Sequence, residues 1–365
     1  MYNPSPAVLN GLKSDIDTTI DKKAYFKGIA THCDNYKESS SLRSFVQSFI
    51  SFSLFFTAVA ALILSVQHSF WLGYALLLIP TSGLLVRLFI IQHDCGHDSY
   101  FENSSRNDFL GRFVSLFTWT PYYYWKRAHN IHHAGSGNLA RRGYGEIKTL
   151  TVEEFKNLSK SDQRLYRLYR HPLFLLVFAT PLFMIIGQRF MSCTSPFLQP
   201  DCAKNVTLSG SKVAKSIHLT NLSLALFYIP LGYFVGFTTL VIAYLPILIL
   251  TCLLGGWLFY IQHQFEDTHW KPQGEWSYNE AALMGSSYYD LPKWAQWFSG
   301  NIGIHHVHHL NSSIPNYRLQ ECIDDMPELK SINRMTFKDS LQCIKWALWD
   351  EKSEKMIPFS AIDKV

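Results

Sequence analysis

The chain has 365 residues, of which 48% are hydrophobic and 15% aromatic, and its formal net charge is +5. Acidic residues are mixed with the basic ones, which argues against a nucleic-acid-binding arm. The seven cysteines are irregularly spaced and include no CxxC pair. This pattern argues against a disulfide framework and a thiolate metal site, so we expect reduced structural thiols.

The first 43 residues are mixed and polar, and they predict a soluble, partly ordered N-terminal segment. No secretory signal peptide is recognisable, because the first apolar run starts late and is too long for an h-region. Residues 44–86 contain no Asp, Glu, Lys or Arg. A helix needs about 20 apolar residues to cross a bilayer, so this block has room for two crossings. It predicts a helical hairpin in the membrane over residues 45–91.

A second charge-free block covers residues 216–265 and predicts a second hairpin over residues 219–261. Residues 92–218 and 262–350 are polar, aromatic and rich in histidine, and we expect them to form a helical cap. Together these parts form a membrane domain over residues 44–350, followed by a C-terminal tail, 351–365. The predicted fold class is an all-α integral membrane protein with four transmembrane helices.

Two apolar stretches of the cap are too short or too interrupted for clear spans. Pro172–Gln188 contains Pro181, and a crossing there would place the histidine clusters described below on opposite sides of the membrane. We therefore predict that it lies flat in the interface or is re-entrant, and we treat Phe109–Trp125 in the same way.

Basic residues predict the orientation in the membrane. The turns inside the hairpins, Gln67–Ser69 and Gly232–Gly236, carry no Lys or Arg. By the positive-inside rule, both termini and the cap are expected on the cytoplasmic side. The membrane would be the inner membrane in a bacterium or the endoplasmic reticulum in a eukaryote. The basic residues of the central segment are Lys126, Arg127, Arg141, Arg142, Lys148, Lys156, Lys160, Arg164, Arg167 and Arg170.

Most of the 15 histidines are clustered. Three motifs, HDCGH, HNIHH and HHVHH, contain the spacing HxxxH or HxxHH. Residues three or four apart share one face of a helix, so each motif directs its imidazoles to one point. The histidines in these positions are His93, His97, His129, His132, His133, His305, His308 and His309.

Eight imidazoles exceed what one ion needs, because catalytic zinc typically takes three protein ligands. The number predicts two metal ions with open positions, although imidazole alone does not identify the metal. His263, in QHQFED directly after the second hairpin, is predicted as a ninth ligand. His306 should point away, and we expect ordinary roles for His32, His68, His171, His218 and His269.

Carboxylates near these motifs are candidates to orient the imidazoles, since metal-bound histidines usually donate their other ring N–H to an acceptor. The candidates are Asp94, Asp98, Glu146, Glu266 and Asp267. Aromatic residues near the second and third motifs fit either an apolar substrate slot or an aromatic belt at the membrane surface. They are Tyr122, Tyr123, Tyr124, Trp125, Tyr288, Tyr289, Trp294 and Trp297.

The three motifs and the strings around them resemble the membrane fatty-acid desaturase family with its three histidine boxes. The resemblance extends over residues 92–350 and includes HDCGHDSYF, TPYYYWKRAHNIHHAGSGNLARRGYGEIKTL, WLFYIQHQFEDTHW and GNIGIHHVHHLNSSIPNYRL. Within the family the chain looks most like the bacterial-type acyl-lipid omega-6 (delta-12) desaturases. The resemblance implies an iron pair held by the nine histidines, O₂ as co-substrate and an acyl chain bound in a bent apolar tunnel.

The resemblance also implies electrons from ferredoxin or cytochrome b5. The chain has no HPGG heme motif, so we expect the donor to be a separate protein. A membrane hydroxylase or ketolase acting on a lipid or hydrocarbon would share the boxes and is the alternative activity. A zinc-dependent hydrolase and a metal transporter are further alternatives, although a transporter should carry ionisable residues inside its spans. The sequence does not determine the double-bond position, the chain length and carrier, the donor or the oligomeric state.

Overall fold

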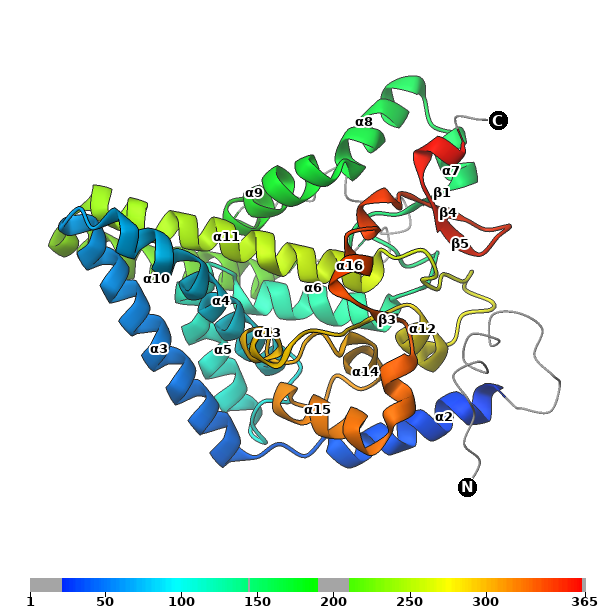
Figure 1. Ribbon diagram of the computed structural model, residues 1–365, viewed down its shortest axis with the longest axis horizontal. Coiled ribbons are helices and arrows are strands. Elements are labelled where there is room, and N and C mark those ends of the chain that lie inside the picture. Colours follow the sequence, from blue (N-terminus) through cyan, green and yellow to red (C-terminus); the bar gives the residue numbers. More distant parts are fainter. Residues whose placement is uncertain (1–21, 144, 190–209, 363–365) are drawn as a thin grey trace.

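The computed structural model describes residues 22–143, 145–189 and 210–362. Four long apolar helices run toward one end of the molecule, and shorter helices form a cap at the other end (Figure 1). The chain is therefore an integral membrane protein, as the charge-free blocks predict. Within these residues, the four helices long and apolar enough to span a membrane are α3 (Ser41–Gln67), α4 (Trp71–Gly96), α10 (Ser211–Val235) and α11 (Phe237–His263).

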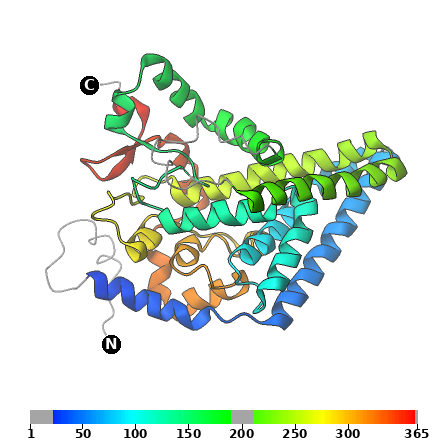
Figure 2. The same cartoon turned by 180° about the vertical axis from the view of Figure 1, so that it is seen from behind.

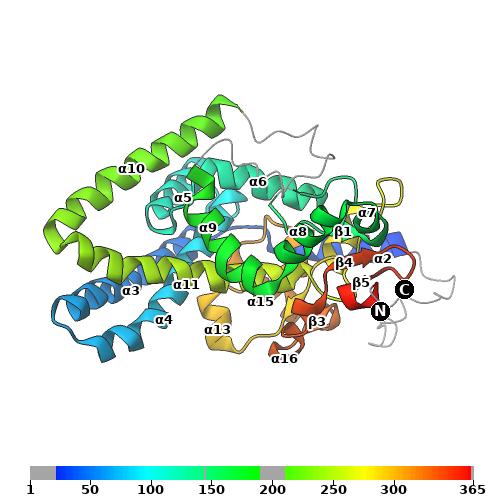
Figure 3. The same ribbon diagram turned by 90° about the horizontal axis from the view of Figure 1, so that it is seen from above.

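These helices form two hairpins whose turns lie side by side. In the first turn Ser69 has a positive φ of 56°, and in the second Gly236 has a φ of 91°. The side-chain amide of Gln67 donates a hydrogen bond to the carbonyl of Val235 at 3.2 Å, so the two turns touch. Both turns lie at the end of the molecule far from the cap (Figure 3).

The cap is built from short helices, and α6 crosses its middle when the molecule is seen from behind (Figure 2). Its helices are α2 (Lys22–Cys33), α5 (Ser104–Thr118), α6 (Tyr122–Gly135), α7 (Val152–Lys156), α8 (Lys160–Arg170), α9 (Thr180–Ile185), α12 (Tyr278–Met284), α13 (Lys293–Phe298), α14 (His305–Leu310), α15 (Asn316–Asp325) and α16 (Phe337–Ser340). Shorter 3₁₀ or π segments are η1 (Asp34–Tyr36), η2 (Leu173–Ala179), η3 (Gly187–Arg189), η5 (Pro327–Ser331), η6 (Cys343–Lys345) and η7 (Phe359–Ala361).

Two small sheets, which the sequence did not indicate, connect distant parts of the cap. β1 (Leu150–Thr151) pairs in parallel with β4 (Leu348–Asp350), which pairs antiparallel with β5 (Lys355–Ile357). β2 (Tyr288–Tyr289) pairs in parallel with β3 (Arg334–Met335). Each strand has only two or three residues, too few for an alternating pattern to be recognised. Because β1 precedes the second hairpin and β4 follows it, the sheet joins both halves of the cap.

The N-terminal helix α2 packs on the cap rather than standing apart from it. Phe26, Ile29 and Cys33 are buried in one apolar cluster with residues of α12, α14 and α15. The Sγ atoms of Cys33 and Cys322 lie 3.7 Å apart, and both thiols are free. Both side chains are buried where α2 packs on α15.

The segment α8–η2–α9 explains how the cap stays on one side of the membrane. Taken together, α8 and residues 173–189 are long and apolar enough to count as one candidate span, but they bend by 70° at the break. Histidines before and after the second hairpin meet in one place, as described below, so the chain crosses the membrane an even number of times between them. The helices α10 and α11 supply two crossings, which supports the prediction that Pro172–Gln188 does not span.

Candidate metal centre

The first histidine motif lies at the very end of α4. Helix α4 continues past the expected end of the hairpin, and it carries His93 in its last turn and His97 as its C-cap. The amide of His97 donates to the carbonyl of His93 at 3.2 Å, which closes the helix over the first imidazole. The two rings lie with centroids 4.7 Å apart, so HxxxH places both on one side of the helix.

The second motif lies on α6, which packs directly against the end of α4. The hydroxyl of Tyr122 donates to the carbonyl of Cys95 at 2.7 Å and fixes the start of α6 beside the first motif. His129, His132 and His133 all lie on the buried side of this helix.

The third motif forms the six-residue helix α14, in which every side chain is buried. His305, His308 and His309 face the other histidines, and the ring of His133 stacks on that of His309 with centroids 4.0 Å apart. His306 turns the other way, because its Nε2 lies 2.9 Å from the carbonyl oxygen of Leu329. The prediction that His306 points away is confirmed.

His263, the last residue of α11, lies among these histidines. Its Nδ1 is 3.2 Å from the carbonyl oxygen of Gly285, which favours the tautomer with a proton on Nδ1. Its Nε2 is then free, and it lies 3.2 Å from Nε2 of His132 and 3.0 Å from Nε2 of His305. The location just past the second hairpin correctly predicts this proximity.

Eight of the nine histidines fall into two neighbouring groups that could each hold a metal ion. Within each group the candidate nitrogens lie within 4.8 Å of one another. The first group is His93, His97, His129, His133 and His308; the second is His132, His263 and His309. His305 joins the second group through its short approach to His263.

Burial disfavours the charged form of the imidazoles that lie in the cap. Desolvation, with repulsion from His93, lowers the pKa of His132 to about 3. Burial also lowers the pKa of His306 to about 4. For the others outside the membrane helices, burial and the neighbouring imidazoles hold the pKa well below the ordinary value; these are His97, His129, His133, His305, His308 and His309. Neutral imidazole is the form that binds a metal.

Unpaired nitrogens at the centre of the cluster provide a test of metal binding. The Nε2 atoms of His93 and His97 and both ring nitrogens of His309 are buried without a hydrogen-bond partner among the described residues. Buried polar atoms are normally satisfied, so such a set needs an explanation. Metal ions coordinated by one nitrogen of each ring would supply it for Nε2 of His93 and His97 and for one nitrogen of His309, and the residues present therefore fit a metal pair.

Two of the five candidate carboxylates contact the cluster. Asp94 Oδ1 lies 3.0 Å from Nδ1 of His93, and Glu146 Oε2 lies 3.6 Å from Nδ1 of His132. Asp94 also accepts from the backbone and side-chain amides of Asn316 at 2.7 and 2.8 Å, a partner for which the sequence offered no signal. Burial raises the pKa of Glu146 to about 7, although the Gly143 amide and Arg142 act in the opposite direction.

The other three candidates do not orient any of the nine imidazoles. Asp98 forms an ion pair with Lys126 at 2.8 Å. Glu266 and Asp267 lie at the surface beside Lys355. The prediction from proximity in sequence is wrong for these three carboxylates. Each lies in a turn just after α4 or α11, and the turn directs the side chain away from the histidines.

Comparison with known proteins agrees with this geometry. The profile of the family described as fatty acid desaturase matches residues 34–331. A fatty acid desaturase of Bacillus subtilis is 36% identical over 330 residues, which cover 90% of each chain. The chain belongs to the fatty acid desaturase family.

Relatives with lower identity also match most of this chain. The sn-1 oleoyl-lipid 12-desaturase of Synechocystis is 24% identical over 280 residues, covering 72% of this chain and 71% of its own. An sn-1 acyl-lipid omega-3 desaturase (ferredoxin) of Synechocystis is 26% identical over 300 residues, covering 79% and 76%. The family identifies this protein as an oxidoreductase with a fatty-acyl substrate.

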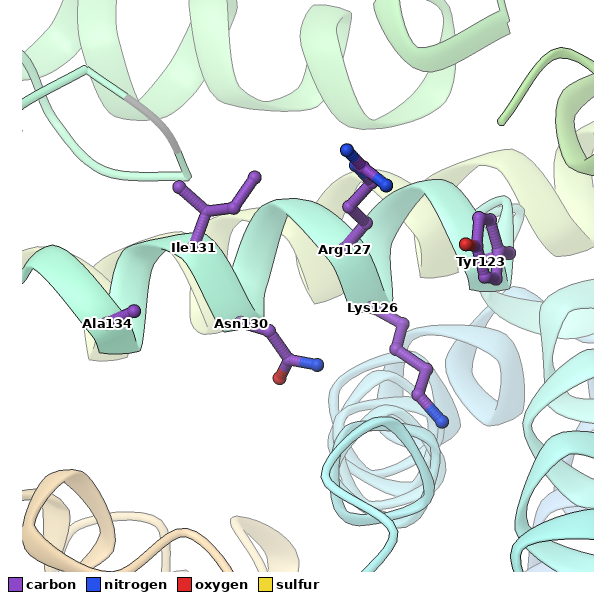
Figure 4. Close-up of a pocket in the computed structure, with 6 residues that line it drawn as sticks. All are labelled: Tyr123, Lys126, Arg127, Asn130, Ile131 and Ala134. Atoms are coloured by element: carbon purple, nitrogen blue, oxygen red, sulfur yellow. The ribbon is translucent and has the colours of Figure 1, made fainter. Parts of the chain in front are cut away.

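A surface pocket of about 390 Å³ lies along α6 and is lined by none of its histidines (Figure 4). Figure 4 shows Lys126 and Arg127 directed to different sides of this helix rather than converging on one point. Because no histidine of the metal centre lines the pocket, we treat it as separate from that centre. Its lining residues are Tyr123, Lys126, Arg127, Asn130, Ile131 and Ala134.

Proposed function

We propose that this desaturase introduces a cis double bond into the acyl chain of a membrane lipid, using O₂ and a pair of iron ions held by nine histidines. The observation that carries the proposal is the convergence of all nine in one buried cluster at the ends of the membrane helices. A bound iron pair would supply the reduction of O₂ and the removal of two hydrogens from adjacent methylenes.

We assign the ligands by the two groups of nitrogens. His93, His97, His129, His133 and His308 would hold one iron. The second iron would be held by His132, His263, His305 and His309, a set supported by the short distances around His263. Asp94 accepts from Nδ1 of His93 and holds the tautomer and direction of that ring, whereas Glu146 lies 3.6 Å from Nδ1 of His132, beyond hydrogen-bond distance.

The position of the cluster suits a substrate that resides in the bilayer. His93 and His263 terminate membrane helices, so an acyl chain needs to rise only a short way to reach them. The ring of Trp125 stacks on His129 with centroids 4.6 Å apart and lies 5.7 Å from His93. Among the eight aromatic residues singled out in the sequence, Trp125 is thus placed to form an apolar wall beside the irons.

We infer that electrons come from a separate carrier of the ferredoxin type. Two relatives, the omega-3 desaturases of Synechocystis and Helianthus annuus, carry ferredoxin in their names. Reconstitution with reduced ferredoxin and, in parallel, with cytochrome b5 tests this assignment. Turnover with cytochrome b5 alone would overturn it.

For the position of the double bond we propose the omega-6 (delta-12) site of a lipid-linked oleoyl chain. The relatives named oleoyl-lipid 12-desaturases support this choice, although omega-3 desaturases match about as well. Expression in a host lacking polyunsaturated lipids, followed by mass spectrometry of intact lipids, locates the new bond. A new bond at another position would refute the regiospecificity, and a product heavier by one oxygen would identify a hydroxylase instead.

The metal and the orientation need separate tests. Elemental analysis of the purified desaturase should find about two irons per chain and little zinc; the size of the ligand set predicts the number of metal ions, and the family predicts iron. Cysteines introduced near Lys148 and Lys338 should react with a membrane-impermeant reagent only from the cytoplasmic side, and those near Gln67 and Gly232 only from the other. Labelling of positions 148 and 338 from opposite sides would refute the proposed topology.

A further inference from the structure

Two short elements of the cap expose large apolar side chains although neither belongs to a membrane-spanning helix. One is α13, and the other is the continuous stretch of α16 and η6. Five side chains are exposed on them: Trp294 by 71%, Phe337 by 65%, Leu341 by 46%, Ile344 by 42% and Trp297 by 37%. Phe337, Leu341 and Ile344 follow the spacing of one helix face. We call these five residues the ledge.

The ledge is one surface, although its two parts are about 40 residues apart in the chain. The strands β2 and β3 are parallel, so the elements that follow them leave the small sheet at the same end. The hydroxyls of Tyr289 and Ser340 lie 3.2 Å apart and hold α16 against this sheet. Seen from above, α13 and α16 occupy the same edge of the molecule, and α13 lies beside α4 (Figure 3).

The ledge contacts the membrane helix α4 at a defined distance from His93. The guanidinium of Arg87, buried in α4, lies 4.1 Å from the ring centroid of Trp297 and donates to its carbonyl oxygen. Arg87 also donates to the hydroxyl of Ser51 on α3 at 2.9 Å. It precedes His93 by six residues, which is about 9 Å along a helix. The ledge therefore lies beside the last turns of α4 before the metal centre.

Basic side chains border the apolar ones. Lys293 begins α13, and Lys338 and Lys345 lie on either side of Leu341. The nearby carboxylates are engaged within the protein, since Asp339 accepts from Thr336 and Asp290 pairs with Arg334. Trp and Lys around exposed apolar residues are typical of elements that lie in a membrane interface.

We propose that the ledge is embedded in the lipid headgroup and upper acyl region of the bilayer leaflet next to the metal centre. Its lysines would contact anionic headgroups. Continuity with α4 through Arg87 and Trp297 favours lipid over a protein partner, because the surface adjoining the ledge is itself lipid-facing. Trp294 and Trp297 then belong to an aromatic belt and not to a substrate slot. The ledge fixes how deep the metal centre sits, and so which part of the leaflet lies beside it.

A spin label measures this directly in the full-length protein. The variants Leu341→Cys and Glu351→Cys, the latter at the turn between β4 and β5, are labelled in nanodiscs that contain anionic and zwitterionic phospholipid. The unsubstituted protein, with its seven native cysteines, is labelled in parallel and its signal subtracted. Collisions with O₂, which concentrates in lipid, are compared with collisions with a polar nickel chelate.

At position 341 the label should collide with O₂ severalfold more than with the nickel chelate, and at position 351 the order should be reversed. A predominance of nickel collisions at both positions would place the ledge in water and overturn the proposal. Protection of position 341 from both reagents would mean that protein covers it, either a second copy of the chain or a redox partner, and would overturn it as well.

A second measurement avoids introduced cysteines. Brominated lipids quench tryptophan fluorescence on contact, so wild-type protein should lose more emission than the Trp294→Phe variant in nanodiscs brominated near the headgroup. Equal quenching of the two proteins would contradict the lipid contact. Neither experiment depends on bound iron or on turnover. A failure of the proposed lipid contact is therefore distinguishable from a failure of the proposed desaturase activity.

Discussion

Replacing Asp94 by Asn should weaken metal binding with little change in shape. The carboxylate is buried and accepts from His93 through Oδ1 and from two amides of Asn316 through Oδ2. An asparagine has one acceptor oxygen. If that oxygen keeps both bonds to Asn316, its NH₂ group faces Nδ1 of His93, which must then accept. The proton of the imidazole moves to Nε2, the nitrogen that faces the metal site.

The expected size of the effect follows from this change of tautomer. Loss of an orienting partner typically costs 10–100-fold in metal affinity, or about 1.4–2.7 kcal/mol. The lost charge-assisted hydrogen bond should lower the free energy of unfolding by about 1–3 kcal/mol. The loss of metal affinity should therefore be measurable in an Asp94→Asn variant that still folds.

Asp98 offers a matched control in the same motif. It is exposed, pairs with Lys126, and has a φ of 56°, a conformation that Asn tolerates well. A surface ion pair contributes about 0–1 kcal/mol, so Asp98→Asn should keep its metal. Iron retained after dialysis against a graded chelator series compares the two variants, with thermal unfolding in detergent as a check on folding. Equal retention by Asp94→Asn and wild type would refute the reasoning.

Further substitutions test the rest of the site. His263→Gln should lose iron and activity, whereas His306→Gln should keep both, because His306 bonds to a backbone carbonyl away from the site. Elemental analysis measures the iron content of the two variants, and equal iron in both would contradict the assignment of His263. Glu146→Gln should lower metal affinity less than Asp94→Asn does, because Glu146 lies 3.6 Å from Nδ1 of His132 and makes no hydrogen bond to it; an equal or larger loss in the chelator series would contradict this ranking. Arg170→Ala should lower the free energy of unfolding by about 1–3 kcal/mol, since the carbonyl oxygen of Trp346 loses the donor from which it accepts at 2.7 Å, while Oε1 of Gln264 keeps the hydroxyl of Thr149. Chemical unfolding in detergent measures that loss, and a change below about 1 kcal/mol would show that water replaces the guanidinium.

Much of the architecture could be predicted from local patterns. Charge-free blocks of the right length predict the two hairpins, because crossing a bilayer is a constraint on consecutive residues. The spacing of HxxxH and HxxHH correctly predicts that each motif turns its imidazoles to one side, since helix periodicity is local as well. His306 was predicted to point away, and it does. We also predicted that the three motifs converge, because one site with two metal ions needs ligands from all of them.

Only the tertiary structure decided how the nine histidines divide. His132 and His133 are neighbours in sequence, yet they belong to different groups, as do His308 and His309. Neighbouring residues on a helix point about 100° apart, so a helix packed between two sites serves both, and which residue serves which site depends on how α6 and α14 cross.

The partners of the imidazoles are likewise a tertiary property. Asn316 reaches Asp94 from a helix more than 200 residues away in the chain, whereas Glu266 and Asp267, adjacent to a predicted ligand, turn to the surface. The sequence by itself determined which residue types are available and which face of each helix they occupy. The packing of the cap on the helix ends decided which of them meet, because distances between helices are set by contacts that no local pattern encodes.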